Sequence, residues 1–214
     1  FTSSVAALGL PHEDGVQLDE TSTFDDPPER FHYGYSKLLA ERHVRRAVDE
    51  GCDAVIVNPA TVIGQRDIHF VGGEILRISL RGWTWAAPSG GMGVVGARAV
   101  GEGHILAAER GRTGERYILN ADNLSHRELL VQVAEVVGGR RPSFVLPRAF
   151  IRGLSILLRG YESMGGPRLP LTSRHLSLST ATLYFDGSKA ARELGFRSGS
   201  AVDAIREAWD WYQA

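Results

Sequence analysis

Tyr33 and Lys37 are the residues whose types and spacing suggest chemistry most directly, in the stretch Tyr33-Gly34-Tyr35-Ser36-Lys37. Side chains at positions i and i+4 share one face of a helix. A free tyrosine, with a pKa of about 10, is a poor acid or base at neutral pH, but a neighbouring ammonium favours the phenolate. The pair could therefore transfer protons, although an exposed aromatic ring beside a solvated lysine has the same spacing.

Lysine is rare in this chain. Lys37 and Lys189 are the only lysines among 24 lysine and arginine residues. An ammonium is a compact point charge, whereas a guanidinium is a planar fork that does not fit every lysine site. The use of lysine at position 37 therefore indicates a specific task, while we interpret Lys189 as structural.

Hydroxyl groups follow two predicted strands. Ser3 and Ser4 come after the β-compatible start of the chain, and Asn58-Pro59-Ala60-Thr61 ends the buried run that begins at Asp53. Parallel sheets bind ligands at the carboxyl ends of their strands, where a hydroxyl can hold a carbonyl oxygen. Each segment alone also fits a structural role, but together with the Tyr/Lys helix they would converge on one edge of a sheet.

The hydrophobic periodicity predicts the elements that must position these residues. A helix over 33–50 followed by a buried strand over 53–59 is half of a βαβ unit, which favours an α/β protein. We expect an opening strand over 1–5, a polar loop over 11–32, a further loop over 60–70, a strand over 116–120, and helices over 74–80, 99–109, 125–137, 188–195 and 202–212. Ser125 and Glu128 have the spacing of a capping box. We expect residues 149–158 to form a lid or core helix that lines an apolar pocket.

Composition excludes several classes of function. The net charge of −1 gives no electrostatic footprint for nucleic acid, and no apolar run is long enough for a membrane span. The seven histidines lack metal-ligand spacing, so no metal is expected. The single cysteine, Cys52, suits a reducing compartment, so a cytoplasmic location is expected; we interpret Cys52 as a small buried hydrophobe.

Together these segments resemble the extended short-chain dehydrogenases/reductases, also called the NAD-dependent epimerase/dehydratase family. Within this family, the sequence of these segments is most similar to the dihydroflavonol reductase-like and hopanoid-associated sugar epimerase branch. The resemblance implies a Rossmann-type parallel sheet, of which this chain holds the C-terminal part, and a smaller mixed α/β substrate-binding region. It rests on Phe1 to Ser4 with Gly9, Asp19-Glu20-Thr21, 33–41, 58–64, 103–107, 114–119 and 185–190.

The resemblance also implies roles for individual residues. Tyr33 would be the catalytic acid/base, Lys37 would hold the ribose hydroxyls and tune the tyrosine, and Ser4 would complete the catalytic group by binding the substrate oxygen. Tyr33, Lys37, Pro59, Ala60 and Val62 would contact the cofactor, which is NAD or NADP. Thr61 would contact substrate beside Ser4.

The largest departure from the family is the glycine-rich βαβ unit, which is not found in this sequence. The chain therefore resembles an N-terminally truncated member. Residues 1–68 would form the C-terminal half of the NAD(P)-binding domain. Residues 69–214 would form mainly the substrate-binding region, with 99–120 returning to the Rossmann sheet. We expect the 214-residue chain to bind NAD(P) weakly or not at all.

A literal G-x-G-x-x-G match occurs at residues 91–96. Pro88-Ser89-Gly90 separates it from any preceding strand, and the family order places the phosphate loop before Ser4, so we predict that it binds no dinucleotide. Sugar-nucleotide epimerases often carry an arginine where Met92 aligns, and residues 95–101 lack two acids that are usual there. Both departures disfavour a nucleotide-sugar substrate, since a diphosphate is usually bound by arginine guanidinium groups.

The leading hypothesis is an oxidoreductase that reduces a ketone or aldehyde by hydride transfer with Tyr33 as acid/base. The alternative is a nucleotide-sugar epimerase or dehydratase with tightly held NAD, and a third hypothesis is a noncatalytic binding module or incomplete fragment. The partner would be a small carbonyl compound or sugar nucleotide, with neither nucleic acid nor a membrane span involved. A homodimer is compatible with this interpretation.

Overall fold

The computed structural model describes residues 1–11, 13, 15–164 and 172–214. A parallel pair of strands, β2 (Ile56–Pro59) and β6 (Arg116–Leu119), lies at the centre of one half of the molecule. Every residue of β2 is buried, which is typical of a parallel strand covered on both faces. On its other edge β2 meets the start of the chain, where Thr2 pairs with Val57 in a parallel bridge.

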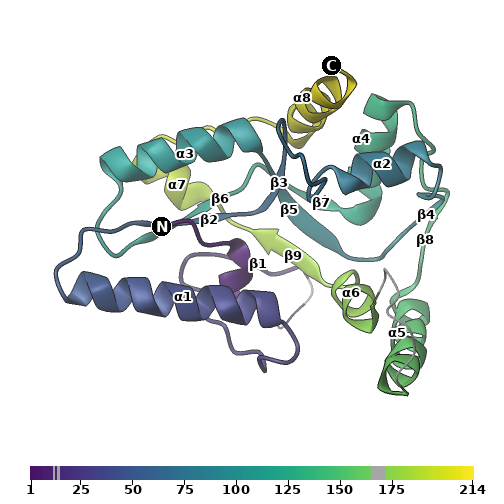
Figure 1. Cartoon of the computed structure of the whole chain (residues 1–214), viewed down its shortest axis with the longest axis horizontal. Coiled ribbons are helices and arrows are strands. Elements are labelled where there is room, and N and C mark those ends of the chain that lie inside the picture. Colours follow the sequence, from purple (N-terminus) through teal and green to yellow (C-terminus); the bar gives the residue numbers. More distant parts are fainter. Residues whose placement is uncertain (12, 14, 165–171) are drawn as a thin grey trace.

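Helices cover both faces of this strand pair (Figure 1). Helix α1 (His32–Asp49) lies along one side, packed on the short 3-10 helix η1 (Val5–Leu8). Helices α3 (Ala97–Arg110) and α7 (Ser188–Leu194) lie along the other side. The core between them is formed by fully buried apolar side chains, among them Leu8, Ile118, Leu119 and Leu194.

A second sheet is built around strand β5 (Gly91–Gly96). Strands β3 (Thr61–Ile63) and β9 (Thr182–Phe185) pair with β5 in parallel, whereas β7 (Asp122–Ser125) pairs with it in antiparallel. Strand β1 (Gln17–Leu18) extends the sheet beside β9. A second core joins this sheet to helices α2 (Glu74–Leu80), α4 (His126–Val137) and α8 (Ala201–Gln213).

The remaining elements lie at the right of Figure 1, with α5 and α6 at the lower right. Strands β4 (Ala86–Ala87) and β8 (Phe144–Val145) pair in parallel. They lead to helices α5 (Arg148–Ser163) and α6 (Ser173–Leu178), which pack on each other. Within the described part of the chain, no helix has the length and apolar character needed to cross a bilayer.

The structure confirms an α/β, Rossmann-like fold dominated by parallel pairing. The expected helices are present, and Ser125 with Glu128 forms the predicted capping box. The prediction of a strand over residues 1–5 was wrong in its extent. Only Thr2 of this segment pairs with β2, in an isolated bridge, because the chain turns at Ser4 into η1. Strands β1 and β3, each of two or three residues, lie in segments expected to be loops. The division at residue 68 stays a prediction.

One side chain lies where the sequence did not place it. Cys52 is exposed rather than buried, because it follows the turn that ends α1, before the buried part of β2 begins at Ile56. A single small apolar residue at such a junction contributes little to a core.

Candidate active site

The first turns of α1 carry Tyr33 and Lys37 on one side of the helix, as their spacing predicts. Lys37 Nζ lies 6.0 Å from the centroid of the Tyr33 ring and 3.5 Å from the carbonyl oxygen of Thr2. Tyr33 is 56% exposed, so its hydroxyl is open to a ligand. A Cβ added to Gly34 would come within 2.4 Å of the Ala6 carbonyl oxygen. The glycine beside Tyr33 thus lets α1 approach η1 closely.

Ser4 begins η1 as its N-cap residue. Its backbone is extended, with φ −163° and ψ 153°, and its Oγ accepts a hydrogen bond from Ala6 N at 3.2 Å. A serine hydroxyl has one hydrogen to donate in addition to the lone pairs that accept. The capping bond therefore leaves the Ser4 hydroxyl hydrogen available to an oxygen of a ligand.

A cavity of about 540 Å³ joins these elements. Ser4 and Tyr33 line it from η1 and α1, and Ala60, Thr61 and Val62 line it from the segment after β2. Five of the predicted site residues are thereby brought together around one space. Pro59 and Lys37 are not part of the lining that the described residues form: Pro59 is buried in β2, and Lys37 lies one turn along α1.

A loop closes another wall of this cavity. Asp67 lines it, and the Asp67 carboxylate accepts hydrogen bonds from Val71 N, Gly72 N and Gly73 N at 2.8 to 2.9 Å. Partial burial raises the pKa of this carboxyl group, but the three backbone donors together lower it below its usual value. Tyr212 OH donates to the Asp67 carbonyl at 3.1 Å, and burial raises the pKa of Tyr212 to about 12. The loop is therefore fixed to the last helix.

A buried carboxylate connects the segments that carry Ser4, Tyr33 and Lys37. Glu41 lies one turn beyond Lys37 on α1, and its side chain is 1% exposed. Glu41 Oε1 accepts hydrogen bonds from Ser3 Oγ at 2.5 Å and from Asn58 Nδ2 at 2.6 Å. Asn58 Nδ2 also donates to the Ser4 carbonyl at 2.9 Å. Glu41 therefore ties helix α1 to the opening segment and to β2.

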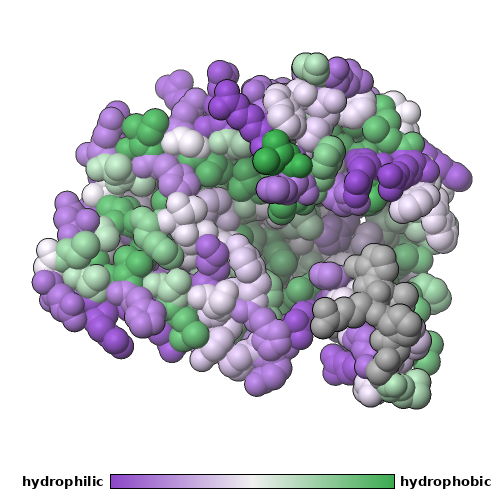
Figure 2. All heavy atoms as spheres, viewed as in Figure 1, coloured by the Kyte–Doolittle hydropathy of each residue, from purple (hydrophilic) through white to green (hydrophobic). Residues whose placement is uncertain are grey.

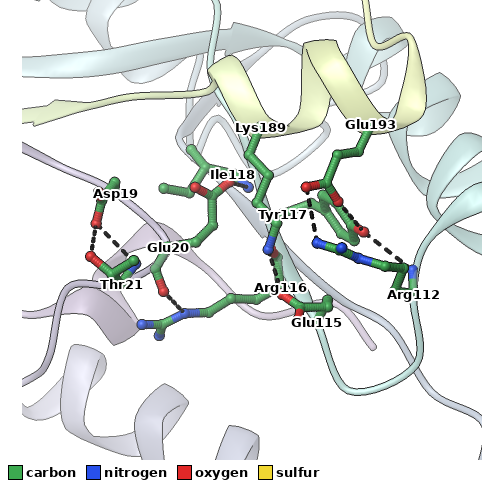
Figure 3. Close-up of polar contacts among 10 residues, drawn as sticks. All are labelled: Asp19, Glu20, Thr21, Arg112, Glu115, Arg116, Tyr117, Ile118, Lys189 and Glu193. Atoms are coloured by element: carbon green, nitrogen blue, oxygen red, sulfur yellow. Dashed lines mark hydrogen bonds and ion pairs between the residues drawn. The ribbon is translucent and has the colours of Figure 1, made fainter.

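Arg116, on β6, completes this network from the other side. Arg116 Nη1 lies 3.5 Å from Glu41 Oε2, and the guanidinium donates to the carbonyls of Glu20 and Ser22 at 2.8 and 2.6 Å. Burial lowers the pKa of Arg116, and the charge of Glu41 opposes that change. The acidic segment at residues 19–21 is thus a structural support for β6, as the Glu20 and Arg116 contacts in Figure 3 show.

Lys189 also belongs to the structural contacts drawn in Figure 3. Its Nζ bonds Glu115 Oε2 at 2.6 Å and the Arg116 carbonyl at 3.0 Å, and it lies 4.7 Å from the centroid of the Tyr117 ring. The bond to Lys189 lowers the pKa of Glu115. These contacts fasten α7 to β6, in agreement with a structural role for this lysine.

The G-x-G-x-x-G match is strand β5 itself rather than a turn between a strand and a helix. A Cβ on Gly91 would come within 2.7 Å of the Leu124 carbonyl, and one on Gly93 within 2.6 Å of Asn120 Oδ1. Close packing against β7 and Asn120 therefore accounts for these two glycines. Met92, between them, lines the cavity beside Tyr33.

Sequence reasoning missed Glu41, Arg116 and the distant walls of the cavity. Glu41 had a local signal, since it lies four residues after Lys37 on the same helix face. The cavity walls had none, because their residues come from segments far apart in the chain: Gly9, Phe31, Gly64 to Asp67, Val71, Gly72, Met92, Ala97, Leu183 and Phe185.

The fold and this site define the class of the protein: a Rossmann-like α/β protein with a Ser/Tyr/Lys group at one edge of the sheet. Residues 1–81 match the model of the NAD dependent epimerase/dehydratase family. The chain is 34% identical to a putative dihydroflavonol 4-reductase of Synechocystis sp., covering 100% of this chain and 63% of the relative. The chain belongs to the NAD-dependent epimerase/dehydratase family, the extended short-chain dehydrogenases/reductases.

Two further similarities support this assignment. The chain is 29% identical to sterol demethylase protein B of Methylococcus capsulatus, covering 99% of this chain and 65% of that relative. The crystal structure of a nucleoside-diphosphate-sugar epimerase from Pseudomonas aeruginosa is 29% identical, with a TM-score of 0.81, and the match covers 99% of this chain and 65% of that one. The chain thus spans less than two thirds of the length of these relatives.

Proposed function

We propose that this chain carries the reacting end of an NAD(P)-dependent oxidoreductase that reduces a ketone or aldehyde. The observation that carries the proposal is the shared cavity: Ser4 and Tyr33 reach it from two elements, and Lys37 stands one helical turn from Tyr33. The relationship to a putative dihydroflavonol 4-reductase supports the same class of reaction.

The residues present fit a nicotinamide ring and a carbonyl group. A volume of about 540 Å³ lies within the range of small-molecule sites. Ala60 and Val62 offer a small apolar wall to a flat ring, with Pro59 behind them in β2. Lys37, one helical turn from Tyr33, would hold ribose hydroxyls. When bound, the nicotinamide supplies or accepts the hydride.

The side chains of this chain then bind the carbonyl oxygen of the substrate and supply its proton. The Ser4 hydroxyl donates a hydrogen bond to the carbonyl oxygen and holds it near Tyr33, with Thr61 beside them on the substrate side. Tyr33 gives its phenolic proton to that oxygen as the alcohol forms. The Lys37 ammonium stabilises the phenolate that remains, because opposite charges attract more strongly in a site partly shielded from water.

Substitution of Tyr33 tests this proposal. In the full-length protein, Tyr33→Phe should lower kcat for NAD(P)H-dependent carbonyl reduction by about 10²- to 10⁴-fold, the usual contribution of a general acid. Tyr35→Phe is the matched control, since Tyr35 lies on the same helix and contacts Phe24, not the cavity; it should leave kcat nearly unchanged. Full activity in Tyr33→Phe would refute the proposal.

An epimerase or dehydratase that retains NAD is the second candidate. The similarity to a nucleoside-diphosphate-sugar epimerase favours it. The two candidates differ in how the cofactor behaves: NAD trapped in the purified full-length protein supports the epimerase, whereas turnover that depends on added NADPH or NADH supports the reductase. The same Ser4, Tyr33 and Lys37 would serve both reactions.

A further inference from the structure

Helix α5 presents one apolar face to solvent. Phe150, Leu157 and Met164 follow one another at intervals of seven residues, and Leu154 and Tyr161 stand between them. This spacing places all five side chains on one side of the helix. Leu157 is 73% exposed and Met164, the C-cap residue, is 81% exposed. Large apolar side chains gathered on one exposed face mark an interaction site.

The other side of α5 is charged or packed on the protein. Ser155 is buried, and its Oγ donates a hydrogen bond to the Ser173 carbonyl of α6 at 2.8 Å. The prediction that residues 149–158 line an apolar pocket was wrong, because the residues of α5 that line a cavity are charged: Arg148, Arg152, Arg159 and Glu162. A helix with cations on one face and large apolar side chains on the other is typical of helices that lie on a membrane surface.

Exposed aromatic side chains lie on and beside the strand pair that leads into α5. The rings of Phe144, on β8, and Trp85, next to β4, meet edge to face with centroids 5.3 Å apart, and both residues are exposed. Trp83 is exposed as well, and the Arg81 guanidinium lies 5.4 Å from the centroid of its ring. Tryptophan is enriched where proteins meet lipid headgroups, because its ring is apolar and its N–H is polar.

We call these side chains together the α5 surface: Trp83, Trp85, Phe144, Phe150, Leu157 and Met164. Figure 2 shows apolar side chains along the outer edge of the molecule at the lower right, where Figure 1 draws α5. The α5 surface therefore belongs to a part of the molecule that a flat partner can reach.

The charge around the α5 surface is positive. Residues 138–164 contain five arginines and one glutamate, a net charge of +4 in a chain whose net charge is −1. Two of these arginines have partners, since Arg141 pairs with Glu135 at 3.1 Å and Arg148 is also engaged. Without these two arginines the segment still carries a net charge of +2, from Arg140, Arg152, Arg159 and Glu162. Such a segment complements an anionic surface.

We propose that the α5 surface binds the anionic headgroup layer of a lipid bilayer, with α5 lying in the plane of the membrane surface. The apolar side chains enter the boundary between headgroups and acyl chains, while the arginines reach lipid phosphates through their flexible stems. A second copy of the chain fits this surface less well, because a two-fold interface would bring the same arginines of both copies together. The proposal does not depend on the reaction at Tyr33.

Sedimentation of the full-length protein with lipid vesicles tests the proposal. Vesicles of phosphatidylglycerol and phosphatidylcholine in equal parts should bind the protein, and raised salt should weaken this binding. Vesicles of phosphatidylcholine alone should bind it about 10- to 100-fold more weakly, as expected when two or three arginines lose an anionic surface. The double variant Phe150→Ser/Leu157→Ser should bind the anionic vesicles about 10- to 100-fold more weakly, because two large side chains no longer enter the bilayer.

Ile105→Ser is the matched control, because Ile105 is 60% exposed on α3 and outside the α5 surface. It should leave vesicle binding unchanged. Circular dichroism and gel filtration check the fold and the oligomeric state of each variant. Failure of the protein to bind anionic vesicles, or equal binding by the folded double variant, overturns the inference. It is likewise overturned if the protein ignores vesicles and the double variant turns a dimer into a monomer, since a second copy then covers the α5 surface.

Discussion

Glu41 is the carboxylate that holds the helix of Tyr33 and Lys37 against the segment of Ser4, so its removal should be costly. Glu41→Ala deletes the partner of Ser3 Oγ, of Asn58 Nδ2 and of Arg116. Arg116 is only 11% exposed, so its charge would lose its nearby counter-charge in a buried site. Removing one partner of a buried ion pair lowers the free energy of unfolding by about 3 to 5 kcal/mol.

The expected value lies at the lower end of that range. Arg116 keeps its bonds to the carbonyls of Glu20 and Ser22, and Asn58 keeps its bond to the Ser4 carbonyl. We therefore expect Glu41→Ala to lower the free energy of unfolding by about 3 kcal/mol. Glu41→Gln keeps an acceptor oxygen but loses the charge, so it should cost about 1 to 2 kcal/mol.

Urea unfolding followed by circular dichroism measures both values. Arg42→Ala is the matched control, because Arg42 is the next residue of α1 and is exposed; its cost should stay below about 0.5 kcal/mol. A double-mutant cycle with Arg116→Gln isolates the pair, and the double variant should cost less than the sum of the single ones. If Glu41→Ala is no more destabilising than Arg42→Ala, the carboxylate does not hold the helix and the reasoning is refuted.

Two further results should follow from packing and from protonation. Gly34→Ala should destabilise the fold by about 1 to 3 kcal/mol, because its Cβ would meet the Ala6 carbonyl oxygen at 2.4 Å. Gly101→Ala is the control: the residue lies on α3 with open space around it, so the substitution should stabilise the fold by about 0.5 to 1 kcal/mol. Equal melting temperatures of the two variants would contradict this reasoning. Burial lowers the pKa of His126 from 6.5 to about 4, so the unfolded chain takes up the proton first, and stability present above pH 6.5 is lost as the pH falls toward 4. Urea unfolding measured between pH 7 and 4.5 should show the free energy of unfolding falling by roughly 3 kcal/mol, and His126→Gln should reduce this fall. An unchanged pH dependence in that variant would argue against burial of the imidazole.

Several elements could be predicted from local sequence patterns alone. The Tyr33 to Glu50 periodicity predicts α1, the β-branched run before Pro59 predicts β2, and the spacing of Ser125 and Glu128 predicts the start of α4. These signals involve neighbours within a few residues, so no knowledge of the rest of the chain was needed. The same locality places Tyr33 and Lys37 on one helix face.

The surroundings of that pair depend on tertiary packing and could not be predicted from the sequence. Strand β5 lies in the middle of a sheet because β3, β7 and β9 come to it from segments before and after it. The bond from Arg116 to Glu41 spans 75 positions, and the cavity at Tyr33 joins Gly9 to Phe185. Such contacts depend on how whole elements pack, and a helical period does not encode which distant side chain will meet a given face.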